Sequence, residues 1–128
     1  MRQWALTAAE AAASKKAEDT VVLDVSSVLS ITEYFVITSA GNDRLVKAIV
    51  EEVERVVKER HRLSPLRVEG LSDAQWVLMD YGDFVVHVFL DEVRRYYDLE
   101  RLWSDVPKIP FSAGGPSSVS ATTAAGGE

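Results

Sequence analysis

Apolar residues recur at helical spacing in the middle of this chain of 128 residues. They lie three or four positions apart, which is the pattern of an α-helix that buries one face: Val46, Ile49, Val50, Val53, Val56 and Val57. Asn42 is a favourable N-cap before this run, and Pro65 bars a helix from continuing through it. We therefore predict a helix over residues 43–60.

Two shorter apolar runs before this helix predict strands. β-branched residues dominate residues 21–25, and residues 34–39 are nearly apolar throughout, as in a strand that is buried on both faces. Residues 26–32 mix turn-forming and apolar side chains, so the pattern does not decide their conformation.

Three further runs after the helix also predict strands, at residues 66–68, 76–81 and 84–90. Only Gly82 and Asp83 separate the last two strands. Glycine in the first position of a two-residue loop favours a type II′ turn, so we expect these two strands to form an antiparallel hairpin.

Helices are also expected near both ends of the chain. Thr7 and Glu10 have the spacing of a capping box, which makes Thr7 the N-cap of an alanine-rich helix over residues 8–17. Residues 92–103 also have a helical pattern, which carries bulky side chains on one side: Val93, Tyr96, Tyr97 and Leu99.

This order of elements predicts an α/β fold with a mixed sheet and flanking helices. A helical crossover permits parallel pairing, whereas the hairpin is antiparallel. The domain is expected to span residues 1–111. Residues 112–128 contain four serines, four glycines, four alanines and no aromatic residue. Such a segment buries too little apolar surface to offset its ordering entropy, so we predict a disordered tail.

Composition and charge narrow the classes of function. The chain has no cysteine and only two histidines, so disulfides, thiol catalysis and cysteine–zinc sites are excluded and other metal sites are not expected. Its formal net charge of −6 repels phosphate backbones and suits a basic protein partner. The sequence shows no membrane span and no signal-peptide pattern, so we expect a soluble, cytoplasmic protein.

Catalytic motifs do not stand out. The chain has no nucleophile elbow, no P-loop and no Gly-x-Gly-x-x-Gly motif. The turn from Ser39 to Asn42 offers backbone N–H groups to an anion, although a plain helix cap is the simpler interpretation. No Asp-x-Asp pair is available for magnesium, and Asp80 and Asp83 flank a turn, where aspartate is common for local reasons. We expect no cofactor and no enzymatic activity.

Aromatic residues are numerous for so small a domain: Trp76, Tyr81, Tyr96, Tyr97 and Trp103. They fill the core or form a recognition surface, and spacing alone favours the core. His87 alternates with Val85 and Phe89, a set that could lie on a partly exposed apolar face. A single histidine in a strand is more often a hydrogen-bonded structural group than a base.

The order and spacing of many residues across positions 8–110 resemble the Iojap-type ribosomal silencing factor family. The matching positions are Val22, Leu23, Asp24, Val25, Thr32, Tyr34, Phe35, Val36, Ile37, Ser39, Arg44, Val46, Glu69, Gly70, Trp76, Leu78, Asp80, Tyr81, Asp83, Val85, Val86, His87, Val88, Phe89, Arg94, Tyr97, Leu99, Glu100, Leu102 and Trp103. The resemblance implies a nucleotidyltransferase-like α/β fold without transferase activity.

The resemblance also implies a function. Such a factor binds the large ribosomal subunit through its fourteenth protein, blocks joining with the small subunit and represses translation under nutrient limitation. It also implies frequent homodimers. A role in assembling the large subunit and a nucleotidyltransferase-type enzyme are the alternatives. Within the hairpin, the resemblance is densest, and we expect Trp76, Asp80, Tyr81 and His87 to contact the ribosome, with Arg94 and Tyr97 supporting them.

Overall fold

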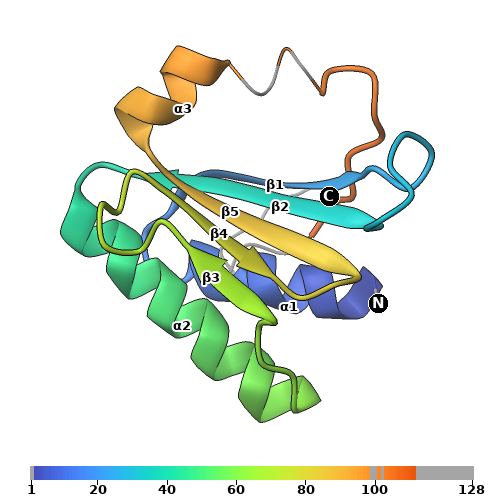
Figure 1. The fold of residues 1–128 in the computed structure, drawn as a ribbon, viewed down its shortest axis with the longest axis horizontal. Coiled ribbons are helices and arrows are strands. Elements are labelled where there is room, and N and C mark those ends of the chain that lie inside the picture. The colour runs from blue at the N-terminus through green and yellow to red at the C-terminus, as the bar shows by residue number, and fades with distance from the viewer. Residues whose placement is uncertain (1, 99–100, 102, 112–128) are drawn as a thin grey trace.

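Five strands form one mixed sheet in the computed structural model, which describes residues 2–98, 101 and 103–111 (Figure 1). The strands lie in the order β1-β2-β5-β4-β3, with these bounds: β1 (Glu18–Asp24), β2 (Tyr34–Ala40), β3 (Arg67–Glu69), β4 (Trp76–Asp80) and β5 (Phe84–Leu90). β2 and β5 pair in parallel, and the other neighbours are antiparallel. The predicted α/β class with a mixed sheet is confirmed.

The parallel pair arises because α2 (Asp43–His61) carries the chain from the centre of the sheet to its edge. β3, at that edge, is followed by β4 and β5, which return step by step to β2. The predicted crossover therefore places β5, and not β3, parallel to β2. As a result, the carboxyl ends of β2 and β5 lie side by side at one end of the strands.

α1 (Arg2–Ala13) and α2 cover one face of the sheet (Figure 1). The predicted valines and isoleucine of α2 provide its buried face, and Asn42 caps it by accepting a hydrogen bond from the Leu45 N–H at 2.8 Å. α1 buries mainly alanines, whose small side chains let it approach the sheet and α2 closely. The main core lies between these two layers.

Both predicted ends of α1 are wrong, because the helix spans Arg2–Ala13 and not residues 8–17. Thr7 lies inside the helix, where its hydroxyl donates to the Gln3 carbonyl at 3.0 Å and lies 2.9 Å from His61 Nε2. Glu10 faces Arg60 of α2 instead of capping a helix end. The helix begins earlier because Trp4 packs against the core, a tertiary contact that the capping pattern does not reveal.

The last helix is shorter than predicted. α3 (Asp91–Tyr97) ends where Asp98 adopts a left-handed conformation with φ 52° and its N–H binds the Arg94 carbonyl. Trp103 is therefore not the end of this helix. Its ring packs edge-on against Phe35 with centroids 5.3 Å apart. Beyond it, the chain returns to the edge of the sheet, where Lys108 bridges Leu23 of β1.

The loops between the strands agree with the sequence pattern where that pattern made a prediction. Residues 26–32, which the pattern left undecided, form turns and bends. The hairpin turn is confirmed: Gly82 has φ 90° and the Tyr81 N–H binds the Phe84 carbonyl. The predicted tail, residues 112–128, lies outside the described residues. Among the helices that the structure does describe, none has the length and apolarity to cross a membrane.

Candidate functional site

The sheet face opposite α1 and α2 is covered along only part of its width. α3 and the segment around Trp103 pack over β1, β2 and part of β5, where they bury Leu23, Ile37 and Phe89. Over β4 and β3 the same face is accessible. We call this accessible part the open face. Its accessible residues on β4 and β5 are Trp76, Leu78, Asp80 and Val85, and the buried His87 lies beneath them.

An aromatic cluster dominates one end of the open face. Trp76 is 37% exposed, and its ring centroid lies 4.9 Å from that of Phe89 and 5.2 Å from that of Tyr97. Tyr97 is 51% exposed and contacts Tyr96, which is 81% exposed. These side chains therefore neither fill the core completely nor lie free on the surface. Phe89 is fully buried, and the rings stacked over it form a surface that is both packed and accessible.

His87 orients the Trp76 ring from beneath. The indole Nε1–H donates a hydrogen bond to His87 Nδ1 at 3.1 Å. An indole nitrogen only donates, so Nδ1 must be unprotonated and the neutral ring carries its proton on Nε2. Burial lowers the pKa of His87 to about 4, which keeps this neutral form at physiological pH. With 8% exposure, His87 supports the open face and offers little surface to a partner.

This arrangement predicts a pH dependence of stability. Below its ordinary pKa of 6.5, His87 takes up a proton in the unfolded chain, whereas the folded chain resists protonation until pH 4 or so. Stability should therefore fall as pH decreases through this window, by about 2 kcal/mol between pH 7 and pH 5. Urea unfolding at both pH values measures it. His87→Gln, which keeps an acceptor for the indole, should lose this part of the dependence. An equal pH slope in both proteins would contradict the assignment.

Asp80 lies at the other end of the open face, next to the hairpin turn. Its Oδ1 accepts the Gly82 N–H at 2.8 Å and thereby fastens the hairpin turn, while its Oδ2 lies 3.2 Å from Arg67 Nη2 on β3. Arg67 also approaches Glu69 at 3.4 Å. The side chain of Asp80 is 22% exposed, so a charged carboxylate is both fixed in place and accessible.

Tyr81 lies on the opposite face of the sheet. Its ring stacks on Phe84 with centroids 4.6 Å apart and packs into the main core under the helices. Burial raises the pKa of its hydroxyl, with a smaller contribution from Glu54 of α2. The structure therefore does not bring Tyr81 together with Trp76, although both belong to the hairpin. The alternation of β4 continues through Tyr81 into the turn.

Arg94 and Tyr97 occupy different positions on α3. Arg94 is 5% exposed, and its Nη1 donates to Ser39 Oγ at 3.1 Å and to the Glu18 carbonyl at 3.3 Å. Arg94 thus ties α3 to β1 and β2, and it has little accessible surface. Tyr97 contributes directly to the aromatic cluster.

Two accessible apolar residues next to the open face do not stand out in the sequence pattern. Leu66 is 72% exposed and Ile31 is 84% exposed, and they border the hairpin from two sides. Ile31 lies in the segment whose conformation the pattern left undecided, so no periodicity marked it. Leu66 was assigned to a strand, but a run of three residues is too short to reveal which side is covered.

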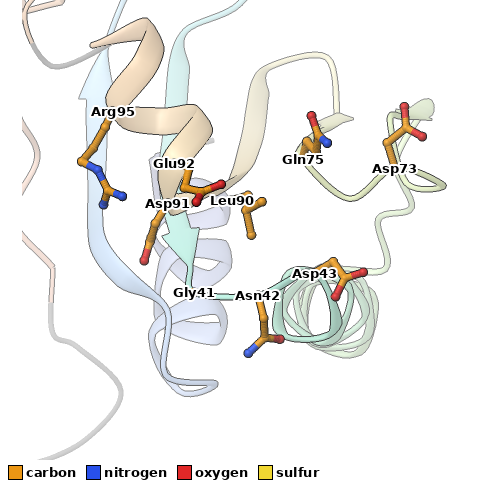
Figure 2. A pocket seen from close by; sticks show the side chains of 9 residues that line it. All are labelled: Gly41, Asn42, Asp43, Asp73, Gln75, Leu90, Asp91, Glu92 and Arg95. Carbon is orange, nitrogen blue, oxygen red and sulfur yellow. The ribbon is translucent and has the colours of Figure 1, made fainter.

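A hollow lies at the carboxyl ends of β2 and β5, the two central strands of the sheet. It has a volume of about 470 Å³, and five of its lining residues carry charge: Asp43, Asp73, Asp91, Glu92 and Arg95. Figure 2 shows the carboxyl groups of Asp43, Asp73 and Asp91 pointing in different directions. Within the described part of the chain, no group of three or more acidic or histidine side chains is placed to hold a metal ion.

Comparisons with known proteins agree on one family. A family model described as "Ribosomal silencing factor during starvation" matches residues 1–126. A protein of Bacillus subtilis (strain 168) named ribosomal silencing factor RsfS is 41% identical over 107 residues, which cover 84% of this chain and 90% of the relative.

Two further matches extend the comparison. A mouse protein named mitochondrial assembly of ribosomal large subunit protein 1 is 34% identical over 92 residues, covering 70% of this chain and 40% of that protein. A crystal structure of a Chromobacterium violaceum protein superposes with a TM-score of 0.76 at 35% identity, covering 91% of this chain and 98% of the other.

Proposed function

The chain belongs to the ribosomal silencing factor family, and from this premise we propose that it binds the large ribosomal subunit through its open face and prevents the small subunit from joining. The proposed contact is the fourteenth protein of the large subunit. Blocking would be steric, because a domain seated where the two subunits meet excludes the small subunit without any chemical step. Its consequence would be repression of translation when nutrients are short.

The observation that carries this proposal is the aromatic cluster on the open face. Trp76 and Tyr97 combine large accessible rings with fixed geometry, since Phe89 and His87 support Trp76 from below. Tryptophan and tyrosine are enriched among the residues that dominate binding energy at protein interfaces. A ring that is already held in place loses little conformational entropy on binding.

Charge supports a protein as the direct partner. The net charge of −6 attracts a basic ribosomal protein and speeds encounter, whereas it opposes extensive contact with ribosomal RNA. The proposed surface of the factor accordingly consists of Trp76, Asp80 and Tyr97. His87 and Arg94 hold this surface in shape from below, and Tyr81 stabilises the hairpin from the helix-covered side.

Sedimentation of mixed ribosomal subunits tests the proposal. With the factor present, we expect the joined particle to decrease, free subunits to increase and the factor to migrate with the large subunit. If the factor migrates with neither subunit, or migrates with the joined particle without reducing it, steric blocking is refuted.

A role in assembly of the large subunit is the second candidate. It is favoured by the name of the mouse relative, which refers to assembly of the mitochondrial large subunit. Both roles would use the same surface, but they differ in timing. An assembly factor would bind immature large subunits in preference to mature ones, so pelleting the protein with each kind of particle separates the two functions.

We also expect the free protein to form a weak homodimer. The open face leaves Trp76, Tyr97 and Leu66 accessible in the isolated chain, and exposed apolar surface of this kind tends to pair. The dimer should dissociate on dilution and compete with ribosome binding. Light scattering across a dilution series measures this, and a monomer at every concentration would contradict the prediction.

A further inference from the structure

A separate hollow lies on the open face at the amino ends of β2 and β5, away from the aromatic cluster. It has a volume of about 320 Å³. Apolar side chains from the β1–β2 connection and from four strands or their flanks form its walls: Leu29, Ile31, Phe35, Leu66, Leu78 and Val85. This size is at the lower end of ligand sites, which suits the side chain of a partner better than a large cofactor.

The rim of this hollow is acidic. Asp80 and Arg67 line it and lie 3.2 Å apart, and Glu69 pairs with Arg67 at 3.4 Å. These three residues carry two negative charges and one positive charge, so the rim has a net charge of −1. A cationic group at the rim would therefore be attracted, whereas an anionic group would be repelled.

The ion pair between Asp80 and Arg67 can be exchanged for another at little cost in free energy. Its Oδ1 stays bound to the Gly82 N–H, while Oδ2 pairs with Arg67, which is itself 64% exposed. Arg67 already lies 3.4 Å from Glu69. An entering cation can thus take the place of Arg67 at Asp80, because Arg67 keeps a carboxylate partner when it is displaced.

The buried end of the hollow carries polar atoms without partners. Thr32 Oγ1 and His87 Nε2 have no hydrogen-bond partner among the described residues, and both side chains line the hollow and are more than nine-tenths buried. Because solvent does not reach either atom, a guest in the hollow meets mainly apolar side chains at this end and makes no hydrogen bond there. The neutral state of His87 also means that this end does not repel a cation.

We propose that this hollow binds one lysine or arginine side chain of the ribosomal protein, with its aliphatic stem against the apolar walls and its charged group at Asp80. Long basic side chains bury their stems along apolar surface and keep their charge at the rim in this manner. The assignment rests on the proposed function and deepens it. The aromatic cluster would supply most of the affinity, and the hollow would set the register and select a basic partner.

Two variants test the hollow by different means. Asp80→Asn removes the charge but keeps an oxygen for the Gly82 N–H, and Val85→Phe fills the hollow without changing any charge. We expect each variant to weaken binding to purified large subunits about tenfold, and Asp80→Asn also to reduce the dependence of affinity on KCl concentration. Asp73→Asn removes the same charge from an exposed site near the carboxyl ends of β2 and β5. This variant should bind large subunits as tightly as the unaltered protein.

A photo-crosslinking residue in place of Leu66 then identifies the occupant. Mass spectrometry should place the crosslink within a short stretch around a lysine or arginine of a large-subunit protein. Crosslinks to a segment without a basic residue, or unchanged affinity in both hollow variants, would overturn the assignment. If the unaltered protein binds and Trp76→Ala weakens it while the hollow variants do not, the proposed function stands and the hollow fails. If the unaltered protein does not bind, both fail.

Discussion

Trp76→Glu should leave the domain folded and abolish its binding to the large subunit. The side chain is 37% exposed on β4, so a glutamate there reaches water in the free protein. In the proposed complex the same carboxylate would be buried against a partner without a counter-charge, which is strongly unfavourable. We expect affinity to fall by at least about 100-fold, or ~2.7 kcal/mol.

Folding must be followed in the same samples, because Trp76 also shields Phe89 and His87. Losing this cover should lower the free energy of unfolding by about 1–2 kcal/mol, a change that thermal melting by circular dichroism detects. Gln3→Glu adds the same charge at an exposed position on α1, on the far side of the sheet, and should bind normally. A Trp76→Glu protein that is folded and still pellets with large subunits would contradict the proposed surface.

Gly70→Ala should strongly destabilise the domain. Gly70 has φ 85°, and an added Cβ would overlap the carbonyl oxygen of Trp76, a backbone atom that cannot move without displacing β4. Left-handed backbone strain and this overlap together should lower the free energy of unfolding by about 3 kcal/mol or more. For a domain of this size, the melting temperature should fall by roughly 10 °C.

The other glycines provide graded controls. Gly82 also has a positive φ of 90°, but its added Cβ would meet only the Leu66 side chain at 3.6 Å, so Gly82→Ala should be destabilised less. Gly41 has no such backbone constraint, and its nearest contact would be Asp91 Oδ2 at 3.9 Å, so Gly41→Ala should be nearly neutral. A melting temperature for Gly70→Ala equal to that of Gly41→Ala would refute the predicted overlap.

Local patterns were sufficient for much of the fold. The apolar spacing of α2, its Asn42 cap and the glycine of the hairpin turn each depend on residues close together in the chain, and the structure confirms all three. Thr7 shows where such reasoning fails. The capping pattern is present, but packing of Trp4 and the contact with His61 place Thr7 inside a longer helix.

In the candidate site, too, local patterns predicted some features and tertiary contacts decided the others. Alternation along β4 correctly places Trp76, Leu78 and Asp80 on one face, because successive side chains of a strand point to opposite sides. It does not reveal how much of that face is covered. The early end of α3 at Asp98 and the return of the chain over Phe35 decide that coverage.

The sequence by itself thus determined the family resemblance, the α/β class and the sets of residues that share a face. The tertiary structure alone decided that Trp76 is accessible while His87 is buried beneath it, and that Tyr81 belongs to the helix-covered side. The physical reason is that periodicity and turn chemistry are local properties. Burial depends instead on segments far apart in the chain, and for His87 these are Phe35 on β2 and Trp76 on β4.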